Sequence, residues 1–451
     1  MSTALIILAA GQGTRMKSDL PKVLHQVAGA PLLVHAMKAG AALAPDRTVI
    51  VAGHGAEAVT EAAQDFDGDA QIALQSEQKG TAHAVAQAAP LLDSYEGDAL
   101  VLYGDTPFIQ PETLAHMAKA REQHDIVVLG FEATDPGRYG RLKMTTEALE
   151  KIIEFKDADE SERAITFCNS GVIAAPAPLL FSLISEIDNN NASGEYYLTD
   201  IVALARKRGL SATAVACDES ETMGVNSRAE LAVAEAAFQS RARATALADG
   251  ITLTAPETVH FAHDTVIGRD TVIEPNVVFG PGVTIESGAR IRAFSHLEGC
   301  HVSRGAVVGP YARLRPGAEL AEDTRIGNFV EIKNAVIDAG AKVNHLSYIG
   351  DAHLGEATNV GAGTITCNYD GVMKHHTEIG RNAFIGSNTM LVAPVSIGDE
   401  AMTASGSVIT RDVPDGALAI ARGDQTIKPG MARKLFDILK SKKAKRDKGA
   451  G

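Results

Sequence analysis

Beyond residue 250 the apolar residues recur with a period of six, which neither an α-helix nor a simple amphipathic strand produces. They fall in three runs: Ile267, Ile273, Phe279, Ile285 and Ile291; Val302, Val308, Leu314, Leu320, Ile326 and Ile332; and Ile379, Ile385, Leu391 and Ile397. Glycine and small residues follow many of them, as in IGRDTV and IGNFVE, because tight corners need unusual φ and ψ angles. The repeat therefore predicts a parallel β-helix, in which the periodic side chains fill a narrow core and each turn covers the next.

These hexapeptides resemble the repeats of the left-handed β-helix found in hexapeptide-repeat transferases. The repeat is interrupted between Ile365 and Ile379 by TCNYDGVMKHHTE, a segment too long and too polar for one turn. We expect a projecting loop, and its length alone favours a functional role and a decorative insertion equally. The flat faces of such a helix also favour self-association.

The first half of the chain follows a different pattern. Apolar, strand-like runs such as TALIILAA, RTVIVAG and DALVLYG alternate with amphipathic helical stretches, which predicts a mostly parallel sheet covered by helices. The stretch SRAELAVAEAAFQSRARATALADG has no proline and no internal glycine, so it predicts one helix that stops at Gly250. We therefore expect an N-terminal domain over 1–226, a helical linker over 227–249, a β-helix over 250–427, and a C-terminal helix and basic tail over 428–451. We expect the last residues, KSKKAKRDKGAG, to be disordered.

Composition excludes several classes of protein. A formal net charge of −14 argues against a surface that binds nucleic acid, because phosphate backbones attract lysine and arginine. Cys168, Cys217, Cys300 and Cys367 are scattered without metal-ligand spacing, so a disulfide framework and a zinc site are not predicted, and a reducing cytoplasm fits. The apolar run from Ala4 to Ala10 is short and leads into a glycine loop, which indicates a strand rather than a signal peptide. No membrane insertion is expected.

The opening LIILAAGQGTRM places a glycine-rich turn at the carboxyl end of the first strand, where open α/β sheets bind ligands. Its backbone amides can cradle phosphate, and Arg15 and Lys22 can add positive charge. The chain lacks the P-loop spelling and the third glycine of the dinucleotide fingerprint, which disfavours kinases and dehydrogenases. Taken alone, the glycine loop is more simply a structural turn.

Further motifs follow in order: GTAHA from Gly80, YGDTP from Tyr103, EFKDA from Glu154, CNSG around Asn169, EYYLTD from Glu195 and GVN ending at Asn226. Together they closely resemble those of the sugar-1-phosphate nucleotidyltransferases, whose domain is an α/β fold with a Rossmann-like mixed sheet. Asp105 follows an apolar strand, so its carboxylate should emerge at the ligand edge and offer oxygen to Mg²⁺, with Asn226 as the second ligand. Capping of turns is the alternative role for both residues.

The resemblance implies attack of a sugar 1-phosphate oxygen on the α-phosphorus of a nucleoside triphosphate. It implies that Gln75, Gly80 and Thr81 contact uracil and that Gly140, Glu154 and Asn169 hold the sugar. The full set of implied nucleotide and sugar-nucleotide contacts is Leu8, Ala9, Ala10, Gly11, Arg15, Lys22, Gln75, Gly80, Thr81, Tyr103, Gly104, Asp105, Gly140, Glu154, Asn169 and Asn226.

The β-helix half carries a polar cluster that its rungs do not need, formed by Arg315, Lys333, His345 and Tyr348. Two cations beside a tyrosine suggest an anionic substrate, and a histidine titrates near neutrality, so His345 can accept a proton from an attacking amine. A lone histidine is more often structural, but these neighbours favour acyl-transfer chemistry.

These residues match the acetyltransferase half of the bifunctional N-acetylglucosamine-1-phosphate uridylyltransferase/glucosamine-1-phosphate N-acetyltransferase family, and the resemblance covers nearly the whole chain. It implies that His345 is the general base and that Arg315, Lys333, Tyr348 and Asn359 hold the amino sugar phosphate. The implied acetyl-CoA contacts are Ala362, Asn368, Tyr369, Ser387, Ser405 and Arg422. Ser405 and Gln12 depart from the alanine and lysine usual at those positions in the family.

The resemblance further implies UTP, acetyl-CoA, glucosamine 1-phosphate and N-acetylglucosamine 1-phosphate as substrates, Mg²⁺ as cofactor, and a homotrimer with sites at subunit clefts. It also implies a role in supplying precursors of peptidoglycan and lipopolysaccharide, hence in cell wall biogenesis and cell shape. One alternative is a nucleotidyltransferase whose β-helix is only a scaffold or a regulatory element. Another is a non-catalytic protein that binds sugar nucleotides; Asp105 and Asn226 argue against it, as the His345 cluster argues against a scaffold.

Overall fold

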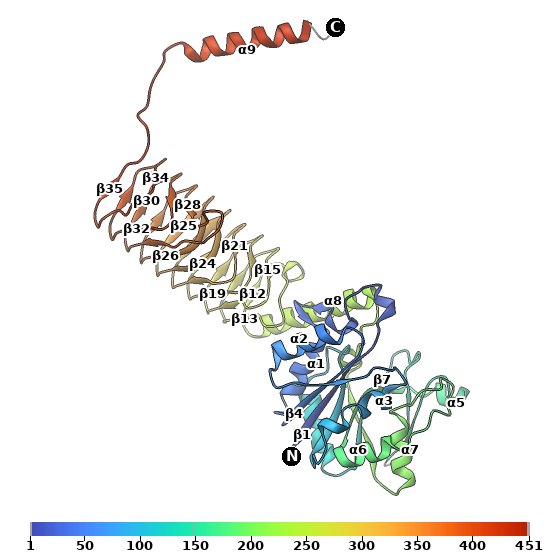
Figure 1. Ribbon diagram of the computed structural model, residues 1–451. Coiled ribbons are helices and arrows are strands. Elements are labelled where there is room, and N and C mark those ends of the chain that lie inside the picture. Colours follow the sequence, from blue (N-terminus) through green and yellow to red (C-terminus); the bar gives the residue numbers. More distant parts are fainter. Residues whose placement is uncertain (1, 147, 449–451) are drawn as a thin grey trace. The chain divides into compact units, whose positions relative to one another are not determined.

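The computed structural model describes residues 2–146 and 148–448 (Figure 1). It divides into two compact units: one runs to Ala248 and includes His260–Thr265, and the other contains Asp249–Val259 and the chain from Val266 onward. The helix expected over 227–249 is α8, Arg228–Ala248, and it belongs to the first unit. Among the described residues, none of the helices combines the length and apolar character that a membrane crossing requires.

The first unit is built on a mixed sheet in the order β11-β7-β10-β6-β1-β4-β5. Strand β10 runs antiparallel to β6 and β7, whereas the other neighbours along this path are parallel. Its strands are β1 Thr3–Ala9, β4 Arg47–Ala52, β5 Gln71–Leu74, β6 Asp98–Tyr103, β7 Ile126–Glu132, β10 Phe167–Pro176 and β11 Ala212–Cys217, with the hairpin β8 Arg141–Met144 and β9 Leu149–Ile153 attached to β10. A separate two-stranded hairpin is formed by β2 Gln26–Val27 and β3 Ala30–Pro31.

Helices cover both faces of this sheet because its strands are apolar on both sides, as expected for largely parallel pairing. On one face α1 Leu32–Ala41, α2 Ala56–Phe66 and α4 Pro111–Arg121 pack side chains such as Met37, Val59 and Leu114 against Ile7 and Ile50. The other face is covered by α3 Thr81–Ala86, α6 Ala177–Ile184 and α7 Asp200–Lys207. The short helix α5, Glu160–Arg163, follows the β8–β9 hairpin.

The second unit is the predicted parallel β-helix, which confirms the fold class derived from the hexapeptides (Figure 1). One face is a ten-stranded parallel sheet formed by β12 Thr252–Leu253, β14 Val272–Ile273, β17 Arg290–Ile291, β20 Val307–Val308, β23 Arg325–Asn328, β25 Lys342–His345, β27 Asn359–Val360, β30 Phe384–Ile385, β33 Met402–Thr403 and β35 Leu418–Ala419. The strands of the remaining faces form one continuous fourteen-stranded sheet, because β24 and β26 are long enough to pair with strands on both of these faces. Its strands are β13 Val266–Ile267, β15 Val278–Phe279, β16 Thr284–Ile285, β18 His296–Leu297, β19 Cys300–Val302, β21 Arg313–Leu314, β22 Ala318–Leu320, β24 Glu331–Ile337, β26 Tyr348–Leu354, β28 Ile365–Cys367, β29 Thr377–Ile379, β31 Met390–Val392, β32 Val395–Ile397 and β34 Val408–Ile409.

The periodic apolar residues form the core of this unit. Ile291, Val308, Ile326 and Val343 are fully buried and lie in register on successive rungs. Ile267 is only half-buried, since its strand β13 is the first of its column and has no earlier strand to cover it. The segment after Ile365 leaves the rungs as predicted, with Val372 87% exposed in a loop that returns to the helix at β29.

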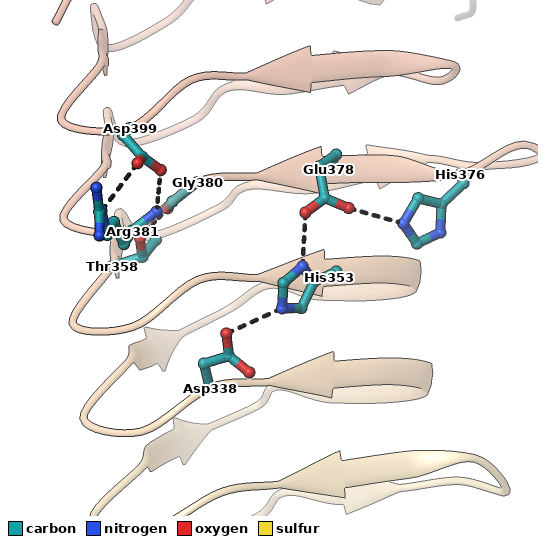
Figure 2. Close-up of polar contacts among 8 residues, drawn as sticks. All are labelled: Asp338, His353, Thr358, His376, Glu378, Gly380, Arg381 and Asp399. Atoms are coloured by element: carbon teal, nitrogen blue, oxygen red, sulfur yellow. Dashed lines mark hydrogen bonds and ion pairs between the residues drawn. The ribbon is translucent and has the colours of Figure 1, made fainter. Parts of the chain in front are cut away.

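A histidine–carboxylate cluster joins three rungs on the outer surface (Figure 2). His353 lies between Glu378 and Asp338, with its Nδ1 2.6 Å from Oε1 of Glu378 and its Nε2 3.0 Å from Oδ2 of Asp338. Burial alone would lower the pKa of His353, but these two carboxylates raise it above its ordinary value. His376 contacts the other oxygen of Glu378 at 3.3 Å. We refer to these four residues as the His353 cluster.

The basic end of the chain differs from the prediction. Residues 440–448, expected to be disordered, continue helix α9, Met431–Lys448, while 449–451 lie outside the described residues. The reason is local, because lysine, arginine and alanine have high helix propensity and the segment KSKKAKRDK contains no glycine or proline.

Candidate functional site

A cavity of about 350 Å³ opens at the carboxyl ends of β1 and β6 in the first unit. It is lined by Leu8, Ala10, Gly11, Lys22, Val23, Gln75, Gln78, Gly80, Thr81, Ala84, Tyr103, Asp105 and Glu195. The glycine loop, the GTAHA motif and the YGDTP motif therefore meet at one place, as expected for ligand binding at the strand ends of an α/β sheet.

Lys22 connects the two residues expected to hold a metal ion. Its ammonium forms an ion pair with Asp105 and donates a hydrogen bond of 3.0 Å to Oδ1 of Asn226. The carboxylate and the amide oxygen thus converge on one positively charged group in a part-buried position. Two hard oxygen atoms suit Mg²⁺, which usually keeps several waters and takes further oxygens from phosphates. No cluster of three or more acidic, histidine or cysteine side chains suited to a metal occurs in residues 2–146 and 148–448.

Backbone contacts fix the positions of these oxygens. The amide of Gly104 donates to the carbonyl of Leu8 at 3.0 Å, which joins the YGDTP motif to the first strand. The amide of Val225 donates to the carbonyl of Asp105 at 2.9 Å, and the amide of Asn226 donates to Oε2 of Glu230 at 2.6 Å. Asn226 is therefore held at the start of α8, close to Asp105.

The wall formed by Gln75, Gly80 and Thr81 rests on the EYYLTD segment. The hydroxyl oxygen of Thr81 accepts a 3.0 Å hydrogen bond from the amide of Leu198, and Gly80 lies against the backbone of Tyr196. The side-chain amide of Gln75 lies 3.4 Å from the carbonyl oxygen of Gly80. The GTAHA and EYYLTD motifs thus form one structural element at the cavity.

Among the residues implied to hold a sugar, Gly140 and Asn169 are hydrogen-bonded to each other, and Glu154 is bonded to Thr199 and acts on Tyr103 through its charge. The amide of Asn169 donates to the carbonyl of Gly140 at 2.8 Å, and the hydroxyl of Thr199 donates to Glu154 at 3.1 Å. Burial raises the pKa of Glu154. Burial, followed by the charges of Glu154 and Asp105, also raises the pKa of Tyr103, which places these groups in one electrostatic environment.

Seven of the predicted residues do not line this cavity as the structure defines it: Ala9, Arg15, Gly104, Gly140, Glu154, Asn169 and Asn226. Arg15 lies exposed in the short helical turn Thr14–Met16. The structure adds Val23 and Gln78, which the motifs did not include, and Ala84 and Glu195, which belong to GTAHA and EYYLTD but had no expected contact. The side-chain amide of Gln78 donates a 2.8 Å hydrogen bond to the carbonyl of Ala10 and so supports the glycine loop.

In the β-helix, the predicted base and several predicted acetyl-CoA residues lie in one column along the axis. Asn328 pairs with His345 between β23 and β25. One rung further, the amide of Gly363 donates to the carbonyl of His345 at 3.2 Å, which places Ala362 above the histidine. The strand registers of β27, β30 and β33 then place Ser387 and Ser405 in line with Ala362. Arg422 donates to the carbonyl of Ser405 at 2.6 Å and ends the column.

The cations form a second group around the fourteen-stranded sheet. Arg315 forms a 2.9 Å ion pair with Glu331. Lys333 lies on β24, one rung further along the helix than Arg315, and it pairs in register with Gly350 of β26. Close contact with Lys374 and the charge of its ammonium lower the pKa of Lys333, so two cations lie near each other. Neighbouring positive charges repel each other, and a bound phosphate dianion would offset this repulsion, so the cluster suits a phosphate ligand.

Asp351 organises the polar groups beside these cations. Its carboxylate accepts hydrogen bonds from the amide groups of Asn334, at 2.6 Å, and Asn368. Asn368 also lies 3.4 Å from the hydroxyl of Tyr348. Tyr348 and Asn368 are therefore neighbours, whereas Tyr369 points outward and is 61% exposed. Asn359 lies on β27 beside Lys342 of the previous rung.

Lys374, Asp351 and Asn328 were missed in the sequence. Lys374 lies in the projecting loop, where a single lysine between apolar and histidine residues has no distinguishing spacing. Asp351 and Asn328 resemble ordinary corner residues of a hexapeptide repeat, and only the strand register reveals their partners.

Comparison with known proteins gives matches over both units. A family model described as the MobA-like NTP transferase domain matches residues 5–177, and one described as the bacterial transferase hexapeptide (six repeats) matches 264–299 and 376–411. A protein named "Bifunctional protein GlmU" from Ruegeria sp. (strain TM1040) is 71% identical over 449 residues, covering 100% of both chains. Proteins of the same name from Ruegeria pomeroyi and Cereibacter sphaeroides are 71% and 67% identical over 448 and 449 residues; they cover 99% and 100% of this chain, and the matches span 100% and 99% of those proteins.

Proposed function

The chain belongs to the family of bifunctional GlmU proteins, and we propose that it makes UDP-N-acetylglucosamine by two group transfers at separate sites. Acetyl transfer from acetyl-CoA to glucosamine 1-phosphate takes place on the β-helix. Uridylyl transfer from UTP to N-acetylglucosamine 1-phosphate, with release of pyrophosphate, takes place in the N-terminal unit. The observation that carries this proposal is the presence of two groups of polar residues, one in each unit, with different chemistry.

For uridylyl transfer, a phosphate oxygen of the sugar attacks the α-phosphorus of UTP, a new P–O bond forms, and the bond to pyrophosphate breaks. Asp105 and Asn226 would hold Mg²⁺, which when bound neutralises phosphate charge. Lys22 already contacts both residues and supplies a further positive charge. Gln75, Gly80 and Thr81 form the wall assigned to uracil, and Gly140, Glu154 and Asn169 form the region assigned to the sugar.

For acetyl transfer, the amine of glucosamine 1-phosphate attacks the thioester carbonyl, a C–N bond forms, and the C–S bond breaks to release coenzyme A. His345 takes the proton lost by the amine. Arg315, Lys333 and Lys374 neutralise the sugar phosphate, with Tyr348, Asn359 and Asn368 nearby. Ala362, Ser387, Ser405 and Arg422 provide a surface along which acetyl-CoA can extend, since they lie on the column above His345.

We also propose that the chain works as a homotrimer in the cytoplasm. Hexapeptide helices favour self-association, and Phe294, Tyr311 and Phe329 form a stack of exposed rings with centroids 4.8 and 5.2 Å apart along one corner. A trimer would have three times the 47.3 kDa mass of the chain, which light scattering measures. A supply of UDP-N-acetylglucosamine would serve peptidoglycan and lipopolysaccharide synthesis, and hence cell wall biogenesis and cell shape.

The proposal is tested by measuring free thiol and pyrophosphate separately with Mg²⁺, acetyl-CoA, UTP and either sugar phosphate. We expect His345→Ala to abolish thiol release and to leave pyrophosphate release from N-acetylglucosamine 1-phosphate intact. Asp105→Ala should have the opposite effect. Pyrophosphate release without any thiol release in the unmodified protein would show that the β-helix is a scaffold or a regulatory element.

A further inference from the structure

The imidazole of His345 has a side-chain partner that none of the functional assignments above includes. Oδ1 of Asn328 lies 2.9 Å from Nδ1 of His345. The ring therefore has one nitrogen engaged with the protein, and Nε2 is the nitrogen left to act on a substrate.

The β-helix itself fixes this pair. Asn328 and His345 are the last residues of β23 and β25, and they are partners in the parallel register of adjacent rungs. Leu346, which follows the histidine, donates a backbone hydrogen bond of 3.1 Å to the carbonyl of Asn328. Ser347 donates its hydroxyl to the carbonyl of His345 at 2.8 Å. These contacts to the main chain of Asn328 and His345 hold their side chains one above the other on adjacent rungs.

The corner that follows repeats the same geometry on both rungs. Phe329 and Leu346 both have φ in the left-handed region, at 55° and 51°, although bulky side chains rarely adopt it. Equal turns keep the preceding residues Asn328 and His345 parallel. On the next rung the residue of the column that follows His345 is Ala362, which carries no polar side-chain atom to compete with Asn328 for the ring.

We propose that Asn328 is a positioning residue of the acetyl-transfer site that fixes the tautomer of His345. A side-chain amide oxygen accepts hydrogen bonds and cannot donate them, so the neutral ring must carry its proton on Nδ1. Nε2 then keeps its lone pair and can accept the proton of the attacking amine. This inference rests on the proposed acetyl transfer and adds to it the residue that prepares the base.

The choice of an amide also suits the charge of the substrate. A carboxylate at the same position would fix the same tautomer, but it would add negative charge beside a site that must receive a sugar phosphate. Asn328 orients the ring without this repulsion. The base keeps its correct tautomer and the anionic substrate keeps its attraction to Lys333, Lys374 and Arg315.

The test compares Asn328→Leu and Asn328→Asp with the unmodified full-length protein, with thiol release measured across pH. Leucine is close to asparagine in size and cannot accept a hydrogen bond. We expect Asn328→Leu to lower kcat by about ten- to a hundred-fold, part of the ~10²–10⁴-fold that a positioned base contributes, with little change in KM. Asn328→Asp should retain activity within a few-fold and move the acidic limb of the pH profile to higher pH, because a carboxylate stabilises the protonated ring.

Pyrophosphate release from N-acetylglucosamine 1-phosphate is measured in the same samples as an internal control for folding. An unchanged kcat in Asn328→Leu would overturn the inference and leave the proposed function standing. Equal loss in both variants would overturn it too, since it would mean that the amide NH₂ and not its oxygen faces the ring. Absence of thiol release in the unmodified protein would overturn the proposed acetyl transfer together with this inference.

Discussion

Replacing Gly80 with alanine should damage uridylyl transfer and leave acetyl transfer intact. Gly80 precedes α3 with φ 116° and ψ 176°, a region of backbone conformation that is essentially restricted to glycine. A Cβ atom added there would lie 2.5 Å from the carbonyl oxygen of Tyr196 and 2.7 Å from its nitrogen. These are backbone atoms and cannot rotate away, so the segments carrying the two residues must separate.

The cost follows from two terms. The backbone conformation costs alanine about 1–3 kcal/mol. Overpacking against Tyr196 adds about 1–3 kcal/mol. Lower entropy of the unfolded chain returns about 0.4–1 kcal/mol, which leaves a net loss of roughly 2–5 kcal/mol. For a unit of this size each 1 kcal/mol shifts Tm by about 2–4 °C, so the Tm of the first unit should fall by roughly 4–20 °C.

The assay measures pyrophosphate and thiol release for Gly80→Ala at a temperature where both units remain folded. Because Gln75 and Thr81 share the displaced wall, we expect KM for UTP to rise about ten- to a hundred-fold, as for any loss of roughly 1.4–2.8 kcal/mol of binding. Thiol release should be unchanged. Gly68→Ala is the matched control, since a Cβ at Gly68 has no atom within 4 Å. If Gly80→Ala matched Gly68→Ala in Tm and KM, the argument from close backbone approach would be refuted.

Three further predictions concern the β-helix. Removing the charge of Lys374 with alanine should raise KM for glucosamine 1-phosphate and leave Tm unchanged or higher, since repulsion with Lys333 is relieved; an unchanged KM in thiol-release assays would contradict this. Ile349 is fully buried, so Ile349→Ala should lower the free energy of unfolding of this unit by about 2–5 kcal/mol in urea titrations without affecting pyrophosphate release; a loss below 1 kcal/mol would contradict core packing. The raised pKa of His353 means that its protonated form stabilises the fold below the ordinary value of 6.5 and that this stabilisation is lost as pH rises through the folded value. The Tm difference between the unmodified protein and His353→Gln should therefore shrink from about pH 6 to about pH 9, and a constant difference would exclude the mechanism.

Periodicity made most of the architecture predictable, because a six-residue repeat leaves few alternatives to a β-helix. Other features of the fold could not be predicted from the local sequence pattern. The reversed direction of β10 is not encoded in strand alternation, which is the same for parallel and antiparallel neighbours. Likewise, His260–Thr265 belongs to the first unit. There the side-chain NH₂ of Gln239 donates to the carbonyl of Phe261 at 2.7 Å, and its side-chain oxygen accepts from the backbone amide of Phe261 at 2.8 Å. A single glutamine in a helical stretch gives no sequence signal that it will bind such a partner.

The candidate sites were predictable where a motif placed chemistry at a strand end. Asp105 and Asn226 lie far apart in sequence, yet both were expected at the ligand edge, and Lys22 contacts both. Residues that act from loops or through register were not predictable. Gln78 and Asn328 are ordinary polar residues until their partners, Ala10 and His345, are known.

The projecting loop between Ile365 and Ile379 is an insertion that contributes a residue, Lys374, to the group of cations on the β-helix. Rungs are ordinarily about 17 residues apart, as for Asn328 and His345, but Thr358 and Ala383 are separated by 25. The extra length does not disturb the stack, because the strands on either side of it remain in register. The loop is also ordered from within, since Asp370 accepts hydrogen bonds from the amides of Val372 and Met373 at 2.8 and 2.7 Å. The ordered loop adds the charge of Lys374 to those of Lys333 and Arg315, and Asp351 is the carboxylate whose charge acts on both lysines. This gathering of positive charge suits an anionic ligand and favours a functional role of the loop over a decorative one.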